Sequence, residues 1–161
     1  MTLVFNASPV IVLAKAGLLE TISAVGDSVK IPQAVVDEIQ RADDVNDPAK
    51  LWFDGSGLPF QRVANPPIPT FLAAWDLGEG ESAVIATAAA TRGALAVLDD
   101  LAARRCAEAH GIPRIGTLGL LLLSKKRHIL PSVTDAIRAV TVAGLYVTEA
   151  IATEIRLDAG E

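Results

Sequence analysis

Short apolar runs alternate along the chain with longer segments whose apolar residues recur at helical spacing. The short runs have the length of buried strands, and turn-forming or capping residues separate them from the helical segments. Strands that alternate with helices predict a parallel sheet covered by helices, which is an α/β fold. The expected strands are residues 3–5, 29–31, 60–63, 94–98, 114–115 and 145–148.

The predicted helices begin at recognisable signals. Ser8 and Pro9 predict the N-cap and the first residue of the first helix. Thr117 is expected to cap a later helix, and Ser132 with Asp135 matches a capping box. The expected helical segments are residues 9–16, 18–25, 32–42, 49–53, 70–75, an Ala-rich stretch from 79 to about 91, 100–110, 117–127, a helix after 132, and 149–157.

The segment of residues 43–69 breaks this regularity. It contains Asp-Gly-Ser-Gly at 54–57 and Asn-Pro-Pro at 65–67, which are typical of turns and loops. We therefore expect an irregular insertion, or lid, on the surface. Too little chain precedes it to form a separate domain, so the sequence predicts a single domain over residues 1–161.

Composition excludes several protein classes. The 161 residues are 51% hydrophobic and 20% charged, which excludes a disordered chain and suffices for a core. Cys106 is the only cysteine, which excludes a disulfide scaffold and suits a reducing compartment. One Cys with His110 and His128 cannot build a four-ligand zinc site. The apolar run 118–123 is too short to span a bilayer and the N-terminus lacks a positive signal-peptide region, so we expect a cytoplasmic protein.

The net charge of −5 argues against binding of nucleic acid through overall charge. It does not exclude a small basic rim around an acidic site that a metal ion fills. The placement of the acidic residues relative to the predicted strands therefore matters more than their number.

Polar residues follow the predicted strands at the edge where ligands bind in open parallel sheets. Carboxylates that converge there repel one another unless a cation offsets their charge. Hard oxygen ligands select Mg²⁺ or Mn²⁺, which suits phosphodiester hydrolysis. The residues at this edge are Asn6 and Ser8, Glu38, Glu79 and Glu81, Asp99 and Asp100, and Gly116 with Thr117.

Each of these residues also has a structural interpretation. Glu79 and Glu81 suit the positive N-terminal end of their helix, and Asp100 suits an N-cap. Glu38 lies beside an apolar stripe, where a carboxylate is usually solvated. Ser8 and Thr117 are helix caps in this interpretation, His110 and His128 are surface residues, and Cys106 is a packing residue.

The motifs, taken in order, resemble those of PIN-like domains, closest to an uncharacterised prokaryotic subfamily similar to VapC-type toxins. Each motif alone is weak, whereas the ordered set covers residues 3–147. The motifs are Asn-Ala-Ser-Pro at 6–9, Ile-Pro at 31–32 with Val-Val-Asp-Glu-Ile at 35–39, Leu-Gly-Glu-Gly-Glu-Ser-Ala at 77–83, Leu-Asp-Asp at 98–100, and Ile-Gly-Thr-Leu-Gly at 115–119.

This resemblance implies a metal-dependent ribonuclease on a Rossmann-like α/β/α sandwich with Mg²⁺ or Mn²⁺ as cofactor. It implies a catalytic quartet of Asn6, Glu38, Glu81 and Asp99, of which the three acids are the metal ligands. Glu79 competes for the third place, and Asp100 supports the fourth. Ser8 and Thr117 would orient ligands or water.

Asn6 departs from the family, whose first position is an Asp. An Asn side chain offers a carbonyl oxygen without a charge, which should weaken Mg²⁺ binding. Three explanations stay open: a natural member that binds without cutting, an engineered inactive form of a toxic nuclease, or a site for which the remaining acids suffice.

The expected substrate is RNA. Arg104 lies one helical turn after Asp100, where it can reach a phosphate, whereas the cations at 125–128 equally suit a helix C-terminus. Seven aromatic residues in all predict no platform for stacking bases. The resemblance further implies a homodimer and an antitoxin partner.

Two other functions stay open from the sequence. One is a non-catalytic PIN-like module that binds nucleic acid or protein. The other is a phosphoryl-transfer α/β domain, which Asp99, Asp100, Thr117 and Lys125 loosely suggest, although no Asp-x-Asp-x-Thr motif follows a strand. A dinucleotide-binding enzyme is disfavoured because no Gly-x-Gly-x-x-Gly follows a strand.

Overall fold

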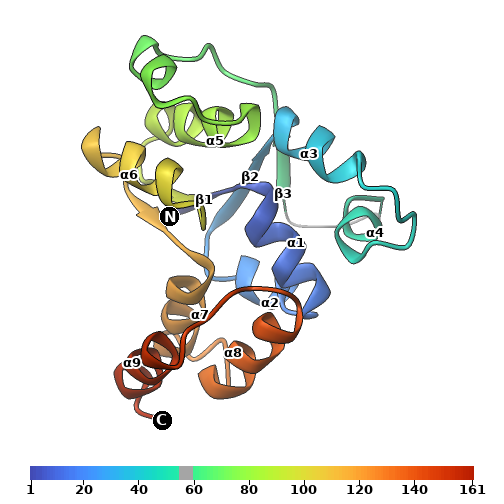
Figure 1. Cartoon of the computed structure of the whole chain (residues 1–161), viewed down its shortest axis with the longest axis vertical. Helices are drawn as coiled ribbons and strands as arrows, with labels where there is room; N and C mark the ends of the chain where they lie inside the picture. The colour runs from blue at the N-terminus through green and yellow to red at the C-terminus, as the bar shows by residue number, and fades with distance from the viewer. Residues whose placement is uncertain (55–59) are drawn as a thin grey trace.

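A computed structural model describes residues 1–54 and 60–161 of the chain. Helices and strands alternate along most of it (Figure 1). In chain order the elements are β1 Thr2–Phe5, α1 Ala7–Lys15, α2 Leu19–Ser23, β2 Ser28–Pro32, α3 Gln33–Gln40, α4 Pro48–Asp54, β3 Phe60–Val63, the 3₁₀ helix η1 Thr70–Trp75, α5 Glu79–Ala90, β4 Ala94–Val97, α6 Leu101–Ala109, β5 Arg114–Ile115, α7 Thr117–Lys126, α8 Val133–Val142 and α9 Glu149–Ala159.

The described strands form one parallel sheet in the order β3-β2-β1-β4-β5. This order places β1 at the centre, where Val4 is in register with Lys30 of β2 and Ala96 of β4. A central parallel strand is covered on both faces, which explains why β1 is apolar without alternation. The predicted α/β fold, a mainly parallel sheet flanked by helices, is confirmed.

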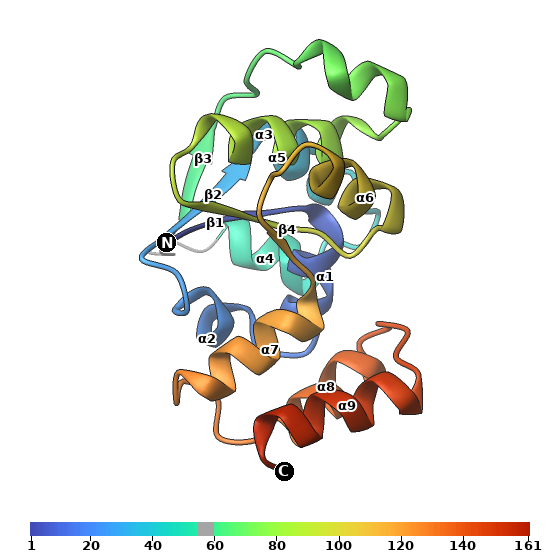
Figure 2. The same ribbon diagram turned by 90° about the vertical axis from the view of Figure 1, so that its left-hand side faces the viewer.

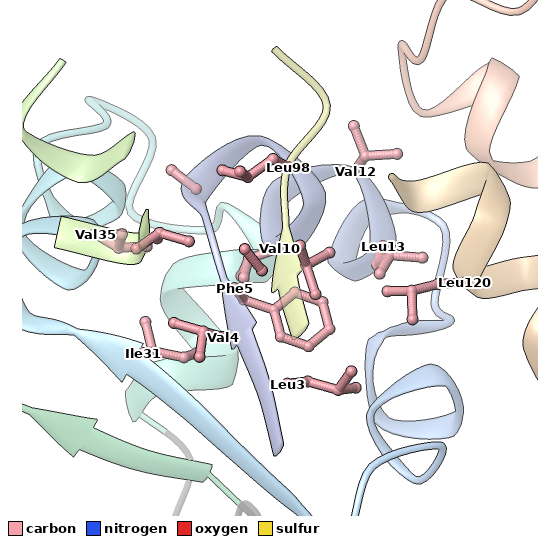
Figure 3. Packing of buried hydrophobic residues seen from close by; sticks show 14 of the residues in the cluster. Leu3, Val4, Phe5, Val10, Val12, Leu13, Ile31, Val35, Leu98 and Leu120 are labelled. Atoms are coloured by element: carbon pink, nitrogen blue, oxygen red, sulfur yellow. The ribbon is translucent and has the colours of Figure 1, made fainter. Parts of the chain in front are cut away.

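The core surrounds β1. Leu3, Val4 and Phe5 have no exposed surface. Figure 3 shows the Phe5 ring among residues that include Leu13 of α1 and Leu120 of α7, whereas Val4 lies beside Ile31 of β2. Successive side chains of a strand point to opposite faces, so this short strand contributes to the core on both sides of the sheet.

Helices cover both faces of the sheet. Figure 2 shows α5 and α6 on one side of the strands and α1, α2 and α4 on the other. The last three helices pack against one another, and α7 also contacts α2, so they extend the second side into a further layer. No helix among the described residues is long and apolar enough to cross a membrane.

The described part of residues 43–69 contributes regular elements to the fold. Helix α4 and strand β3 match the expected helix at 49–53 and strand at 60–63. Strand β3 forms the sheet edge beside β2, and the Phe60 ring stacks on Trp52 and meets Phe53 edge-on. The aromatic contacts therefore attach α4 to the edge strand, while residues 55–57 of the expected loop lie outside the described residues.

Three local predictions are wrong. Helix α1 begins at Ala7 after Asn6, so Ser8 is not its N-cap and Pro9 is its third residue. A proline is tolerated there because the first four N–H groups of a helix have no helical partner. Gly116, not Thr117, is the N-cap of α7.

The third wrong prediction is the strand at residues 145–148, which form an extended connection that pairs with no strand in the described chain. Leu145 and Val147 pack against the core as half-buried residues, and Thr148 caps α9 by accepting from the Ile151 amide at 3.3 Å. The apolar residues that predicted a strand here belong to a loop that packs one side against the core.

Candidate functional site

Asn6 marks the centre of the carboxyl edge of the sheet, directly after β1. Its side chain is buried, with 3% of the residue exposed. Its backbone N–H donates to the carbonyl oxygen of Val97 at 3.1 Å, and this bond joins the end of β1 to the end of β4. The backbone that positions Asn6 is thus fixed by the sheet itself.

The Asn6 side chain faces the site instead of capping its own helix. It makes no capping hydrogen bond to α1. Its Nδ2 donates to Oε1 of Glu81 at 3.4 Å, and its buried Oδ1 has no hydrogen-bond partner in the described chain. A buried carbonyl oxygen without a donor costs about 1–3 kcal/mol, so Oδ1 is a ready acceptor for a proton donor or a cation.

Gly80 brings a third element to this point. A β-carbon at Gly80 would lie 2.7 Å from Oε2 of Glu38 and 3.2 Å from Oδ1 of Asn6. The start of α5 therefore approaches both side chains as closely as a bare backbone permits. We call Asn6, Glu38 and Glu81 the edge cluster; they come from the end of β1, from α3 and from α5.

Two carboxylates of the edge cluster repel each other. Desolvation of the Glu38 carboxyl group and then the charge of Glu81 raise the pKa of Glu38, while Arg41 opposes the shift. Glu38 is exposed as a whole residue, yet its carboxylate oxygen faces Gly80 and Asn6. The Glu81 carboxylate lies over Gly78, where a β-carbon would collide with its Oε2. A cation held between these oxygens would remove the repulsion.

Asp99 is held on the neighbouring side of the edge, after β4. The Thr117 amide donates to its Oδ1 at 2.7 Å, and the Thr117 hydroxyl donates to its Oδ2 at 2.6 Å. Thr117 is fully buried, and a β-carbon at Gly116 would lie 3.1 Å from Asp99 Oδ1. The first turn of α7 therefore orients this carboxylate with two short, charge-assisted hydrogen bonds.

The predicted quartet is thus divided into two adjacent groups. Asn6 lies with Glu38 beside Gly80 and is hydrogen-bonded to Glu81, whereas Asp99 is hydrogen-bonded to Thr117. Within residues 1–54 and 60–161, no three His, Cys, Asp or Glu side chains lie together as a metal-binding group. The expected ligand set of Glu38, Glu81 and Asp99 is therefore not assembled as such, and the third oxygen beside the two glutamates belongs to Asn6.

The remaining predicted residues lie around these groups. Asp100 is the N-cap of α6, because its side chain accepts from the Ala103 amide at 2.8 Å. Its structural role as a cap, expected from the sequence, is therefore confirmed. Ser8 and Glu79 are exposed and form no side-chain hydrogen bond in the described chain. Arg104 is exposed, and its Nη1 lies 3.8 Å from the β-carbon position of Gly116, close to Asp99.

Gly78 and Gly80 are positions to which the sequence reasoning gave no role of their own, whereas Gly116 was expected at this edge. At each of Gly78, Gly80 and Gly116, a carboxylate oxygen lies so close to the backbone that a β-carbon would crowd it. The alternation Gly-Glu-Gly-Glu at 78–81 carried this signal, because a helix start with two glycines needs a reason beyond helix propensity.

The edge cluster fits a hard divalent cation. Its atoms nearest Gly80 are carboxylate and amide oxygens, the ligand type that Mg²⁺ and Mn²⁺ prefer. The buried Oδ1 of Asn6 has no hydrogen-bond partner in the described part of the chain. Desolvation, and after it the charge of Glu81, raises the pKa of Glu38, so a cation beside this carboxylate would be favourable. With only two carboxylates in the cluster, the charge available to the cation is lower than a three-carboxylate set would supply.

Comparison with known proteins agrees with the order of the motifs. A sequence model of a PIN domain family, DUF3368, matches residues 2–161, which is nearly the whole chain. No curated protein and no solved structure matches the chain significantly. The family match, the parallel sheet and the acidic carboxyl edge lead to one conclusion: this chain belongs to the PIN domain family.

Proposed function

We propose that the protein is a metal-dependent ribonuclease of PIN type, the toxin of a toxin–antitoxin pair, whose activity is reduced by Asn6. The observation that carries the proposal is the edge cluster. The unpartnered buried Oδ1 of Asn6 and the Glu38 carboxylate lie beside Gly80, and the Asn6 side chain also binds the Glu81 carboxylate. The family match supports a nuclease. The toxin role and the antitoxin partner rest on the resemblance alone.

In this proposal Glu38, Glu81 and Oδ1 of Asn6 hold Mg²⁺ or Mn²⁺. When bound, the ion would polarise a phosphoryl oxygen and favour attack by water on phosphorus. Asp99, fixed by Thr117, presents a carboxylate at the neighbouring strand end, where it can accept a proton from the attacking water or orient it. Arg104 binds a phosphate of the substrate next to Asp99.

Asn6 weakens this site in two ways. Its amide supplies no negative charge, so the cation is attracted by the two glutamates of the edge cluster. Its Nδ2 also donates to Oε1 of Glu81 and occupies part of that oxygen's capacity as a ligand. Activity of the chain as it stands is therefore expected to be lower than that of Asn6→Asp.

The test compares the wild-type chain with Asn6→Asp and with the double variant Asn6→Asp/Asp99→Ala. Mn²⁺ binding is measured by calorimetry, and cleavage is measured on an end-labelled single-stranded RNA. We expect Asn6→Asp to bind Mn²⁺ more tightly and to cut faster than wild type, and the added Asp99→Ala to abolish cleavage. Absence of Mn²⁺ binding in every form would remove the physical basis of the proposal.

A second function is favoured by one observation. The Asn6–Glu81 hydrogen bond offsets a carboxylate without a cation, as a non-catalytic binding module would require. Such a module would bind RNA equally well with Mn²⁺ or with EDTA, and Asn6→Asp would not cut. Induced expression separates the toxin role: Asn6→Asp should arrest bacterial growth, and wild type should arrest it less.

A further inference from the structure

A cavity of about 520 Å³ opens beside Asp99. Its volume falls in the range of pockets that hold small ligands, about 300–1,000 Å³. Its walls come from α6 and β5, from the start of α7, from the connection between α8 and α9, and from α9 itself. The residues that matter below are Asp99, Arg104, Leu118, Tyr146, Ile151 and Glu154.

Tyr146 is the only tyrosine of the chain, and 88% of it is exposed. It lies in the connection that the sequence predicted as a strand, and its ring belongs to no aromatic pair in the described residues. An isolated exposed tyrosine is ordinary on a protein surface. Here, however, Tyr146 lines the same cavity as Asp99 of the candidate site.

Arg104 lines this cavity on the Asp99 side. The exposed guanidinium forms no ion pair in the part of the chain that the structure describes, whereas Arg114, which also lines the cavity, is paired with Glu108 at 2.7 Å. Asp99 has both oxygens engaged by Thr117. Arg104 is thus the cation of the cavity that is available to a ligand anion.

The cavity therefore presents an available cation close to the candidate site together with an exposed aromatic ring, and apolar contacts from Leu118 and Ile151 lie alongside. A nucleotide matches this combination, because it joins an anion to a flat aromatic base through a sugar. A base stacks on a protein ring only when it is unpaired, so the match is to a single strand and not to a duplex. Glu154 on the wall disfavours a run of several phosphates along α9, which limits the match to one nucleotide.

We propose that this cavity binds one nucleotide of single-stranded RNA, with its base against Tyr146 and its phosphate at Arg104. This inference rests on the proposed ribonuclease function and adds to it a residue that positions the substrate beside Asp99. It also revises the expectation that the chain has no platform for a base, because one exposed ring suffices at a single-nucleotide subsite.

The experiment measures binding of a short fluorescein-labelled single-stranded RNA by anisotropy, with Ca²⁺ in place of Mn²⁺ to suppress cleavage. The proteins are wild type, Tyr146→Phe, Tyr146→Ala and Arg104→Ala, and Val142→Ala serves as a control at another exposed apolar residue outside the cavity. Tyr146→Ala should weaken binding about 5- to 150-fold, the loss expected for one stacked base. Tyr146→Phe and Val142→Ala should bind within about twofold of wild type, because Phe keeps the stacking ring.

Two further arms test the assignment of base and phosphate. A set of RNAs that each lack one base should contain a member for which wild type and Tyr146→Ala bind equally. Arg104→Ala should lower the salt dependence of log K by about 0.7, the contribution of one phosphate contact to a single strand. Circular dichroism checks that each variant is folded.

The outcomes separate this inference from the function beneath it. If wild type binds and cuts RNA while Tyr146→Ala binds as tightly, the nucleotide subsite is overturned and the ribonuclease stands. If Tyr146→Phe loses as much as Tyr146→Ala, the hydroxyl acts and stacking is overturned. If wild type neither binds nor cuts any RNA and Asn6→Asp does not either, both proposals fail together.

Discussion

Asn6 and Glu81 lie 75 residues apart in the sequence, yet Nδ2 of Asn6 donates to Oε1 of Glu81 at 3.4 Å. This contact gives the acidic edge a stable arrangement without a metal ion, because an amide donor stands where an aspartate would add a negative charge. The same amide leaves its Oδ1 buried and unpartnered in the described chain. Stability without metal and affinity for metal are therefore expected to change in opposite directions at this position.

Asn6→Asp should destabilise the metal-free protein. The substitution replaces a donor to Glu81 by a like charge facing both glutamates of the edge cluster, and loss of a hydrogen bond to a charged group costs about 1.5–3 kcal/mol. Urea unfolding in EDTA measures the loss of stability, and saturating Mn²⁺ should restore the stability. Asn46→Asp, at an exposed loop position, is the matched control and should change stability by less than about 0.5 kcal/mol. Equal stability of Asn6→Asp and wild type in EDTA would contradict the prediction.

Glu38 should make stability depend on pH. Burial and the charge of Glu81 raise the pKa of Glu38 above its ordinary value of 4.5, so the folded protein favours the protonated form. The wild-type protein therefore loses stability relative to Glu38→Gln as pH rises from about 4.5 through the raised pKa of the folded state. In EDTA, the thermal midpoint of Glu38→Gln should therefore rise relative to that of wild type as the pH increases over that interval. The exposed Glu20→Gln control should show no such trend, and a pH-independent difference at Glu38 would refute the interpretation.

Gly80→Ala should harm metal binding more than folding. The added β-carbon would lie 2.7 Å from Oε2 of Glu38, whose flexible end can move away, and alanine favours the helix over glycine by about 1 kcal/mol. Displacement of the carboxylate should weaken Mn²⁺ binding about 10- to 100-fold, which is the usual effect of losing the groups that orient a metal ligand. Calorimetry measures this effect, and Ser82→Ala on the same helix is the control. An unchanged affinity would show that Glu38 is not a ligand in this position.

Thr117→Val should destabilise the protein by about 1.5–3 kcal/mol, because Asp99 loses a hydrogen bond from a fully buried hydroxyl that a methyl group replaces. Thr117→Ser should retain most of the stability. The same change at Thr141, whose hydroxyl donates to the neutral carbonyl of Ile137 at 2.8 Å, should cost less, about 0.5–1.5 kcal/mol. Urea unfolding compares the three variants, and equal losses at the two positions would contradict a special role for the Asp99 contact.

Glu161 should stabilise the packing of the last helices in a pH-dependent way. Its carboxylate pairs with Lys125 at 2.8 Å and accepts from the amides of Val133 and Thr134 at 2.9 and 2.8 Å, at the start of α8. The bond from Lys125, followed by those from α8, holds the pKa of Glu161 far below its ordinary value of 4.5.

A depressed pKa stabilises the fold above the ordinary value, and this contribution is lost as the pH falls below about 4.5 toward the folded-state pKa. Glu161→Gln should therefore lower the thermal midpoint at neutral pH and approach wild type on acidification. Glu154→Gln, an exposed change on α9, serves as the control. A difference that grows on acidification would overturn the assignment.

Much of the fold followed from local patterns. The apolar run at 3–5, the Ala-rich helix after Gly78 and the Asp100 cap correspond to β1, α5 and the start of α6. The strand expected at 145–148 was wrong because a short apolar run also occurs in a loop that packs on the core. Likewise, Ser8 has the chemistry of a cap, but the sheet bond from Asn6 to Val97 decides where β1 ends and α1 begins.

The sequence by itself determined the fold class, the family motifs and which acidic residues occupy the strand ends, because these depend on periodicity and local order. The tertiary structure decided how the acids are grouped: Glu38 and Glu81 both lie beside Asn6, and Asp99 is bound by Thr117. It also placed the exposed Tyr146 at the rim of a cavity that Asp99 lines. Side-chain distances across a sheet edge depend on crossover geometry and on how closely a glycine backbone can approach, and neither is encoded in the spacing of residues along the chain.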